Sequence, residues 1–487
     1  LVGDPRPITH PVKFFEKGDR PLEIVTSRQW YIRNGGREQA VRDAMLARGG
    51  ELRWHPDHMH HRYDNWVEGL NGDWLISRQR WFGVPIPVWY PLDAEGNVVH
   101  GSPLVPDESS LPVDPSTDVP AGYDASQRGV PNGFVADPDV MDTWATSSLT
   151  PQIAGRWGDD DALFASVYPY DVRPQAHDII RTWLFSTVVR SHFEHGAAPW
   201  ANAALSGWIL DPDRKKMSKS KGNVVTPVDL FDQYGSDAVR YWAACARPGI
   251  DTAFSEEQMK VGRKLATKIL NVTKFVLGAA GGQRGGDVTE PIDRAMLARL
   301  AAVVDEATRA FDNYDYARAL ERTEQFFWWF CDDYVELVKT RAYEADGGPA
   351  TESARAALAS ALSVLQRLFA PFLPFTAEEV WSWWQDGSVH VAAWPSDTAT
   401  GNEQLTDADG FLDAVCGTIA AIRRTKTEAK VSQKAAVESV TVTAPEQMVA
   451  AVQSAWDDIA AAGSVARADI KVGGDELQVT TVLAPTA

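Results

Sequence analysis

The stretch "DPDRKKMSKSKGNVVTP", Asp211 to Pro227, places five basic residues within the eight positions from Arg214 to Lys221. The whole chain of 487 residues has 47 Lys and Arg against 66 Asp and Glu, a formal net charge of −19. So much positive charge in one loop of an acidic chain indicates that this loop binds an anionic ligand. Lysines interleaved with serine and glycine form a segment rich in hydrogen-bond donors that suits a polyphosphate. A solvated charge run is the alternative, because a short basic motif is weak evidence by itself.

The residues on either side of this loop predict a strand before it and a helix after it. The run Ala203 to Leu210 is mostly apolar and predicts a buried strand, which ends in the turn Asp211-Pro-Asp213. Thr226 and Pro227 have the pattern of a helix start, with Thr at the N-cap and Pro at the first helical position. A strand, a loop and a helix in this order indicate an α/β domain with a parallel sheet.

Composition narrows the class of protein. The three cysteines, Cys245, Cys331 and Cys416, form no Cys-x-x-Cys pair, which favours a reducing compartment and argues against a disulfide framework. No apolar run approaches about 18 residues and the N-terminus has no signal-peptide pattern, so we expect a cytoplasmic protein with no membrane partner. The chain opens without a Met, in a stretch that resembles the middle of a fold, and we expect an N-terminal truncation.

Beyond Ser255 the pattern changes to amphipathic helices. Five of them, joined by short loops, predict a helix bundle. Their starts are predicted at capping patterns: Ser255-Glu-Glu-Gln258, Thr289-Glu-Pro291, Thr351 and Thr376-Ala-Glu-Glu379. The tail from about 405 predicts a helix, a strand over 437–443, another helix and two strands. The fold class is therefore α/β followed by mainly α, with a small α+β module at the end.

The order of residues in the basic loop carries a family resemblance. Lys216-Met217-Ser218-Lys219-Ser220, followed by Lys-Gly-Asn, resembles the KMSKS signature of class I aminoacyl-tRNA synthetases. The resemblance implies ATP as a substrate, with Mg²⁺, and a loop that binds ATP while the amino-acid carboxylate attacks the α-phosphorus. It implies that Lys216 and Lys219 stabilise phosphoryl charge, that Met217 anchors the loop, and that Ser218 and Ser220 belong to the ATP site.

A second stretch, "RPQAHDIIRTWLF" from Arg173 to Phe185, reads as an amphipathic helix with a cap-like Asp178. It resembles the family's Gly-x-Asp segment, although Ala176 stands where the family has Gly. The resemblance implies that Asp178 binds the adenylate ribose and that Trp183 lines the amino-acid pocket. A Trp wall suits a small branched aliphatic side chain.

Two further stretches suggest contacts with tRNA. "NGDWLISRQRWFGVPIPVW", residues 71–89, resembles the segment by which the valyl, isoleucyl and leucyl enzymes return from their editing insertion. Arg78, Arg80 and Trp81 could then face the tRNA acceptor end, or they could only support the domain junction. Near the C-terminus, Arg423 and Arg424 begin a basic run that also contains Lys426, Lys430 and Lys434. This run could meet tRNA phosphates or form an ordinary solvated helix face.

A cluster of four histidines, "HPDHMHH" with His55, His58, His60 and His61, invites a metal interpretation. No regular tetrahedral spacing and no nearby cysteine supports zinc, so the sequence predicts no metal site. Asp142 and Trp144, in "DPDVMDTWATSSL", match another family block without an assigned role.

The resemblance divides the chain and suggests a substrate. The expected parts are the end of the editing insertion and a connector at 1–70, the second half of a Rossmann-type catalytic domain at 71–225 with a loop insertion at about 91–133, a stem-contact linker at 226–255, a helical anticodon-binding domain at 256–400 and an α+β module at 401–487. "DVMDTW" and "AHDIIRTW" resemble the valyl form more than the isoleucyl form. The expected function is ATP-dependent attachment of valine to tRNA, and a monomer is expected.

The first half of the Rossmann fold, with its HIGH-type motif, has no counterpart in the sequence. We therefore expect this chain to be incomplete by itself and to need the N-terminal half of the synthetase. An isoleucyl enzyme is the alternative within the family. A non-catalytic tRNA-binding fragment or accessory protein is the alternative outside catalysis.

Overall fold

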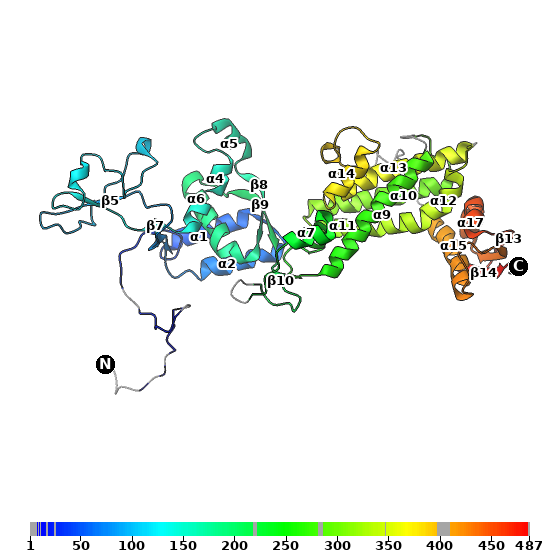
Figure 1. The fold of residues 1–487 in the computed structure, drawn as a ribbon, viewed down its shortest axis with the longest axis horizontal. Coiled ribbons are helices and arrows are strands. Elements are labelled where there is room, and N and C mark those ends of the chain that lie inside the picture. The colour runs from blue at the N-terminus through cyan, green and yellow to red at the C-terminus, as the bar shows by residue number, and fades with distance from the viewer. Residues whose placement is uncertain are drawn as a thin grey trace. The chain divides into compact units, whose positions relative to one another are not determined.

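The computed structural model describes residues 7–485, except 8, 10, 16–17, 24–25, 218–221, 281–285, 346 and 397–409. The chain divides into two compact units, and Figure 1 labels many of their helices and strands. The first unit contains Leu1–Arg173 and Asp178–Ala203, and the second contains Pro174–His177 and Ala204–Ala487. The boundary falls within two strands, β8 (Tyr170–Ala176) and β9 (Trp200–Ser206).

A three-stranded sheet has the order β2 (Arg53–His55), β9, β8, and the first unit contains β2 together with the parts of β9 and β8 on its side of the boundary. Three helices accompany it: α1 (Gln39–Glu51), α2 (His60–Glu68) and α6 (Phe185–His195), and α1 packs against the other two. Tyr63 on α2 is fully buried, and a Cβ on Gly49 would lie only 2.3 Å from its ring. Glycine at this position of α1 therefore permits the close approach of the two helices. The sequence pattern, rich in Pro and Trp, predicts only short extended pieces here and misses α1 and α2.

Short antiparallel ribbons make up much of the rest of this unit. They pair β1 (Tyr31–Ile32) with β3 (Trp74–Leu75), β4 (Ser77–Arg78) with β7 (Val140–Met141), and β5 (Trp89–Pro91) with β6 (Phe134–Ala136). Short helices follow: α3 (Thr143–Ser147), α4 (Thr150–Ala154), α5 (Asp161–Val167) and the π-helical turn η5 (Ile180–Leu184). Residues 92–133, all of which are described, contain two 3-10 turns as their helical elements, η2 (Glu108–Ser110) and η3 (Ala125–Gln127).

The second unit begins with the strand before the basic loop. β10 (Ile209–Leu210) pairs in parallel with β11 (Thr252–Ala253), and α7 (Val228–Tyr234) and α8 (Ser236–Ala244) lie between them in the chain. The predicted helix after the loop is present, but it begins at Val228, with Pro227 in the N-cap position instead of Thr226. Helix ends commonly differ by one or two residues between assignments, so the strand–loop–helix order is the robust feature.

The helices after β11 form a bundle around one apolar core. They are α9 (Glu256–Ala280), α10 (Pro291–Asp312), α11 (Tyr316–Trp329), the π-helical turn η7 (Phe330–Tyr334), α12 (Val335–Ala342), α13 (Pro349–Phe369) and α14 (Pro374–Ser382). Figure 1 shows α9, α10 and α13 running along one another. The predicted stripe on α9 is buried, because Leu265, Ile269, Val272 and Val276 are at most 6% exposed. These side chains belong to a single hydrophobic cluster with residues of α10, α11 and α13.

The start of α14 differs from the sequence prediction for a clear physical reason. The capping pattern at Thr376 predicts the N-cap there, but the helix begins at Pro374. Its free backbone N–H groups are capped from another helix, because Phe375 N and Thr376 N donate to the carboxylate of Asp237 at 3.3 and 2.6 Å. Asp237 lies on α8, so a long-range contact replaces the local cap.

The C-terminal module has the predicted α+β character. It contains α15 (Phe411–Glu428), β12 (Val437–Ala444), α16 (Glu446–Ser454), α17 (Trp456–Gly463), β13 (Ala468–Val472) and β14 (Gln478–Leu483). The central strand β12 is parallel to β13 and antiparallel to β14. One helix was expected between the strands, and the structure has two. Among the described residues, no helix combines the length and the apolar character needed to cross a membrane.

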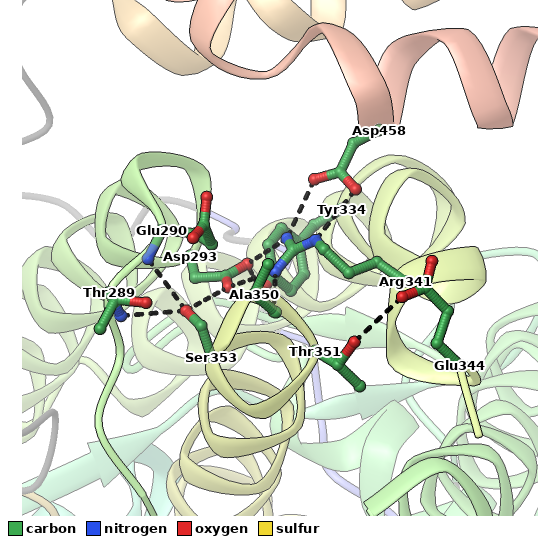
Figure 2. A network of polar contacts seen from close by, with 10 residues as sticks. All are labelled: Thr289, Glu290, Asp293, Tyr334, Arg341, Glu344, Ala350, Thr351, Ser353 and Asp458. Carbon is green, nitrogen blue, oxygen red and sulfur yellow. Dashed lines mark hydrogen bonds and ion pairs between the residues drawn. The ribbon is translucent and has the colours of Figure 1, made fainter. Parts of the chain in front are cut away.

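A buried polar network joins this module to the bundle (Figure 2). Arg341 on α12 donates to Asp293 on α10 at 2.9 and 3.0 Å, and to Asp458 on α17 at 3.0 and 2.9 Å. The Asp293 carboxylate also accepts from Tyr334 and Ser353, each at 2.7 Å. Asp293 is 0% exposed, so these donors replace the water that its charge would otherwise need.

Candidate functional site

The two arms of the basic loop are joined by one carboxylate at its base. Asp211 follows β10 directly and is 7% exposed. Its Oδ1 accepts from the backbone N–H of Lys215 at 2.7 Å, and its Oδ2 accepts from the side-chain amide of Asn223 at 2.8 Å. These donors, first Lys215 and then Asn223, lower the pKa of Asp211 below its ordinary value. The loop therefore starts and ends at a fixed anionic anchor.

The first lysine of the signature is held over an aromatic ring. Lys216 Nζ lies 4.1 Å from the centroid of the Trp208 ring. The backbone carbonyl of Lys216 also accepts from Asn223 at 3.3 Å, and an isolated bridge pairs Lys216 with Leu210. A cation over the face of tryptophan is attracted by the ring quadrupole. The ammonium group thus remains exposed to a ligand while its position is restricted.

Trp208 is held in turn by two residues from other segments of the second unit. The Trp208 backbone N–H donates to Asp251 Oδ1 at 2.8 Å, and the ring packs 4.8 Å from the ring of buried His177. His177 Nε2 lies 3.3 Å from the same Asp251 oxygen. Among the described residues, the buried His177 Nδ1 and Trp208 Nε1 have no hydrogen-bond partner.

The remaining residues of the signature are only partly described. Met217 is half-buried. Ser218, Lys219 and Ser220 lie outside the described residues, so the structure gives no geometry for their predicted roles. Lys216 is therefore the one predicted phosphate-binding lysine whose surroundings are known.

Asp178 and Trp183 belong to the first unit, whereas Lys216 belongs to the second. Asp178 lies in the 3-10 turn η4 (His177–Ile179) and is exposed. Trp183, in the π-helical turn, is buried: its ring stacks 5.6 Å from Trp200 and its Nε1 donates to Ser147 O at 3.0 Å. The Arg173 guanidinium lies 3.9 Å from the same ring. Trp183 thus presents a firmly held aromatic surface.

The predicted tRNA contacts near residue 80 differ in exposure. Arg78 forms an ion pair with buried Asp142 at 3.2 Å, and Trp74 donates to the same carboxylate at 3.1 Å. These contacts give Arg78 and Asp142 a supporting role in the β4–β7 ribbon. Arg80 is exposed, and Trp81 is 91% exposed, so these two side chains are available to a partner.

The basic residues on α15 also differ in whether they are paired, buried or exposed. Arg423 pairs with Asp333 at 3.1 Å and donates to Asp332 O at 3.0 Å. Lys426 is 1% exposed and donates to the carbonyls of Gln433 and Gly463, so it cannot contact phosphate in this fold. Arg424 is exposed and remains available to a polyanion.

A basic groove on α9 was not predicted from the sequence. It has a volume of about 560 Å³ and lies between α9 and the Trp328 side chain. Its lining includes four cations, Lys260, Arg263, Lys264 and Lys268, and the acidic Glu257; Lys260 is paired with Glu257 at 2.6 Å and Lys268 with Asp332 at 2.9 Å. Trp328 is oriented by Glu324, which accepts from its Nε1 at 3.0 Å. The spacing of these cations along α9, at positions i, i+3, i+4 and i+8, is the signal that could have revealed the groove.

Comparison with known families agrees with these features. The profile of "tRNA synthetases class I (I, L, M and V)" matches residues 17–255, and that of "Anticodon-binding domain of tRNA ligase" matches residues 293–442. Two solved structures share the fold at 20% identity. A ternary LeuRS–tRNA–LeuAMS complex from Agrobacterium radiobacter K84 has a TM-score of 0.56 and covers 69% of this chain and 43% of that one. Methionyl-tRNA synthetase of Mycobacterium tuberculosis has a TM-score of 0.53 and covers 71% of this chain and 61% of that one. The chain belongs to the class I tRNA synthetases.

Curated valine–tRNA ligases are similar to almost the whole chain. The ligase from Thermobifida fusca is 62% identical over 489 residues, which is 100% of this chain and 55% of the relative. The ligase from Salinispora tropica is 59% identical over 96% of this chain and 56% of the relative. That from Bifidobacterium longum strain NCC 2705 is 53% identical over 96% and 54%. The chain thus spans about half the length of the curated relatives that it matches.

Proposed function

We propose that this chain is part of a valine–tRNA ligase and that its basic loop binds the phosphates of ATP during amino-acid activation. In that reaction a carboxylate oxygen of valine attacks the α-phosphorus of ATP. A mixed anhydride, valyl-adenylate, forms, and pyrophosphate leaves with the electron pair of the broken P–O bond. Negative charge grows on the phosphoryl oxygens, and positioned cations lower the barrier by stabilising that charge.

The placement of Lys216 is the observation that carries this proposal. Its ammonium group is exposed at the start of a loop that has the family signature, and Trp208 restricts its position. Asp211 fixes the loop base on both sides. Lys219 is the second proposed phosphate ligand, together with Ser218 and Ser220 in the same signature. Asp178 is proposed to bind the adenylate ribose and Trp183 to line the valine pocket.

Mg²⁺ is proposed to enter with the phosphates of ATP. The carboxylate at the loop base is a poor ligand for the cation, because both oxygens of Asp211 already accept hydrogen bonds from the loop. Mg²⁺ commonly retains several waters and binds through substrate phosphates. When bound, it supplies charge neutralisation on the polyphosphate, and the residues of this chain supply position.

The groove on α9 is proposed to contact the tRNA backbone. Lys260 and Lys268 are ion-paired with Glu257 and Asp332. Arg263 and Lys264 are therefore the groove cations that, in this chain of net charge −19, are proposed to meet tRNA phosphates. Trp328 adds an aromatic surface on which an unstacked base can pack. Arg424, Arg80 and Trp81 are exposed and are proposed as further tRNA contacts, whereas Arg78 and Arg423 are engaged by Asp142 and Asp333.

A chimaera tests the catalytic proposal. The part of the Thermobifida fusca relative that this chain does not match is fused to these 487 residues, and valine-dependent ATP–pyrophosphate exchange is measured. We expect exchange with valine in preference to isoleucine. Preferential activation of isoleucine would favour the isoleucyl alternative.

Binding of tRNA is measured separately on the 487-residue chain. Binding by this chain, with no exchange in a folded chimaera, would favour the non-catalytic alternative. Loss of both properties would contradict both proposals.

A further inference from the structure

Three potential metal ligands lie together at the start of α2: His60, His61 and Asp64. One ligand atom from each lies within 4.8 Å of the other two. The histidine spacing alone argues against a metal, because four histidines without a regular pattern define no coordination geometry. The structure supplies a third ligand, because Asp64 lies one helical turn beyond His60 on the same face of α2. It also separates His55, whose Nε2 lies 3.0 Å from Asn202 Oδ1.

The orientation of His60 suits a metal ligand. Its Nδ1 lies 2.7 Å from the backbone carbonyl of Asp57, so this nitrogen carries the proton and donates it. The lone pair is then on Nε2, which lies 3.9 Å from Asp64 Oδ2. Histidines that bind metals almost always donate their other ring N–H to a carbonyl or a carboxylate. Asp57 therefore fixes both the tautomer and the direction of the free nitrogen.

The three side chains stand on a rigid support and remain accessible. Tyr63 and Val67, which border His60 and Asp64 on the same side of α2, are 0% exposed and hold the helix against the rest of the first unit. The His60 and Asp64 side chains are 33% and 36% exposed. Ligand bonds of about 2.1 Å in a tetrahedral site require ligand atoms about 3.4 Å apart. Because Asp57 holds His60, closing the remaining gap requires rotation of the His61 and Asp64 side chains.

We propose that His60, His61 and Asp64 bind a divalent transition-metal cation of the Zn²⁺ class, with water in the remaining coordination positions. Two imidazoles and one carboxylate suit Zn²⁺, Co²⁺, Ni²⁺ or Cu²⁺, whereas Mg²⁺ and Ca²⁺ prefer oxygen ligands throughout. Three ligands at an accessible surface make an exchangeable site. The site is distinct in sequence from the basic loop and does not depend on the proposed ligase activity.

Metal binding to the 487-residue chain tests this proposal directly. After dialysis against a chelator, the chain is titrated with Co²⁺ by absorption and with Zn²⁺ by calorimetry. We expect one cation per chain, with Zn²⁺ displacing Co²⁺ and Mg²⁺ failing to do so. His60→Gln, His61→Gln and Asp64→Asn should each weaken binding about tenfold or more, since each removes one ligand. His58→Gln is the matched control, because exposed His58 is outside the cluster, and it should bind as the unchanged chain does.

Several results would overturn the proposal. They are the absence of binding, unchanged binding in the three ligand variants, or an equal loss in His58→Gln. A thiolate charge-transfer band with Co²⁺ would place the cation on cysteine instead. Circular dichroism checks that each variant is folded. His61→Gln keeps the test valid if another variant unfolds, because the His61 side chain is exposed.

Discussion

The ammonium group of Lys216 lies 4.1 Å from the centroid of the Trp208 ring. Trp208 is itself fixed by Asp251, through its backbone N–H at 2.8 Å, and by the adjacent ring of His177. A lysine side chain on an exposed loop would otherwise sample many rotamers, and holding it in place costs conformational entropy. The second unit therefore holds the first lysine of the signature near one position before any phosphate is bound.

Trp208→Leu tests this arrangement in the chimaera. Loss of the cation–π contact, worth about 0.5–1 kcal/mol at an exposed site, should lower kcat/KM for ATP about two- to fivefold. Trp208→Phe retains an aromatic face and should lose less. Exchange kinetics against ATP concentration provide the measurement. Equal losses in the Leu and Phe variants would mean that packing, and not the ring quadrupole, sets the effect.

Asp211 should control the geometry of the loop through Lys215 and Asn223. Asp211→Ala removes both hydrogen bonds and should raise the KM for ATP more than Asp211→Asn, which retains one acceptor oxygen. Asp213→Ala is the control, because the Asp213 side chain is exposed and, among the described residues, its side-chain contact is with Lys215 at 3.4 Å. An Asp211→Ala enzyme with unchanged kinetics would show that the anchor does not position the lysines.

If the groove on α9 contacts tRNA phosphates, the salt dependence of tRNA binding should change when one of its cations is removed. Lys264→Gln should weaken tRNA binding and should reduce the slope of log K against log salt by about one, the value for one lost phosphate contact. Lys471→Gln on β13 is the control, because Lys471 is exposed and lies outside the groove. Filter binding of tRNA to the 487-residue chain at several salt concentrations gives both slopes. Equal slopes for Lys264→Gln and the unchanged chain would place the tRNA elsewhere.

The Arg341 network should matter for stability. Arg341→Met leaves Asp293 and Asp458 without their cation, and removing one partner of a buried pair typically costs about 3–5 kcal/mol. Arg322→Met is the matched control: it breaks an exposed pair with Glu306 at 3.0 Å and should cost less than about 1 kcal/mol. Urea denaturation measures both changes. A small effect of Arg341→Met would mean that the module is held mainly by its apolar core.

The same network predicts a dependence on pH. Burial raises the pKa of Asp458, although Arg341 opposes this effect. The folded state therefore binds the proton more tightly than the unfolded chain, and this contribution to stability is lost as pH rises through the raised pKa. Asp458→Asn removes the titration, so its destabilising effect should grow as pH falls from neutral. A destabilisation that shrinks towards acidic pH would contradict this sign.

Periodic apolar patterns in the sequence predicted the buried faces of helices correctly. The apolar stripe of α9 at Leu265, Ile269, Val272 and Val276 predicted a buried helix face, and the structure confirms it. The fold class, α/β followed by mainly α, is confirmed by the family profiles and by the solved structures of the same fold. Local patterns failed where distant residues decide the outcome. The start of α14 depends on Asp237, which is more than one hundred positions away in the chain.

In the candidate site, too, the sequence identified a residue but not the distant residues that hold it. The signature identified Lys216, but only the fold reveals Trp208 and Asp251 as its supports. Arg423 and Arg424 are neighbours of the same type in sequence, yet the first is paired with Asp333 and the second is exposed. Burial of a charged side chain depends on partners that periodicity does not encode.

Valine-dependent ATP–pyrophosphate exchange by the chimaera, with and without Lys216→Ala, tests the central claim most directly. The account predicts exchange with valine and a loss of about 100-fold or more in Lys216→Ala, the scale for removing one group that stabilises transition-state charge. Circular dichroism checks that both proteins are folded. Full activity in a folded Lys216→Ala chimaera would contradict the account.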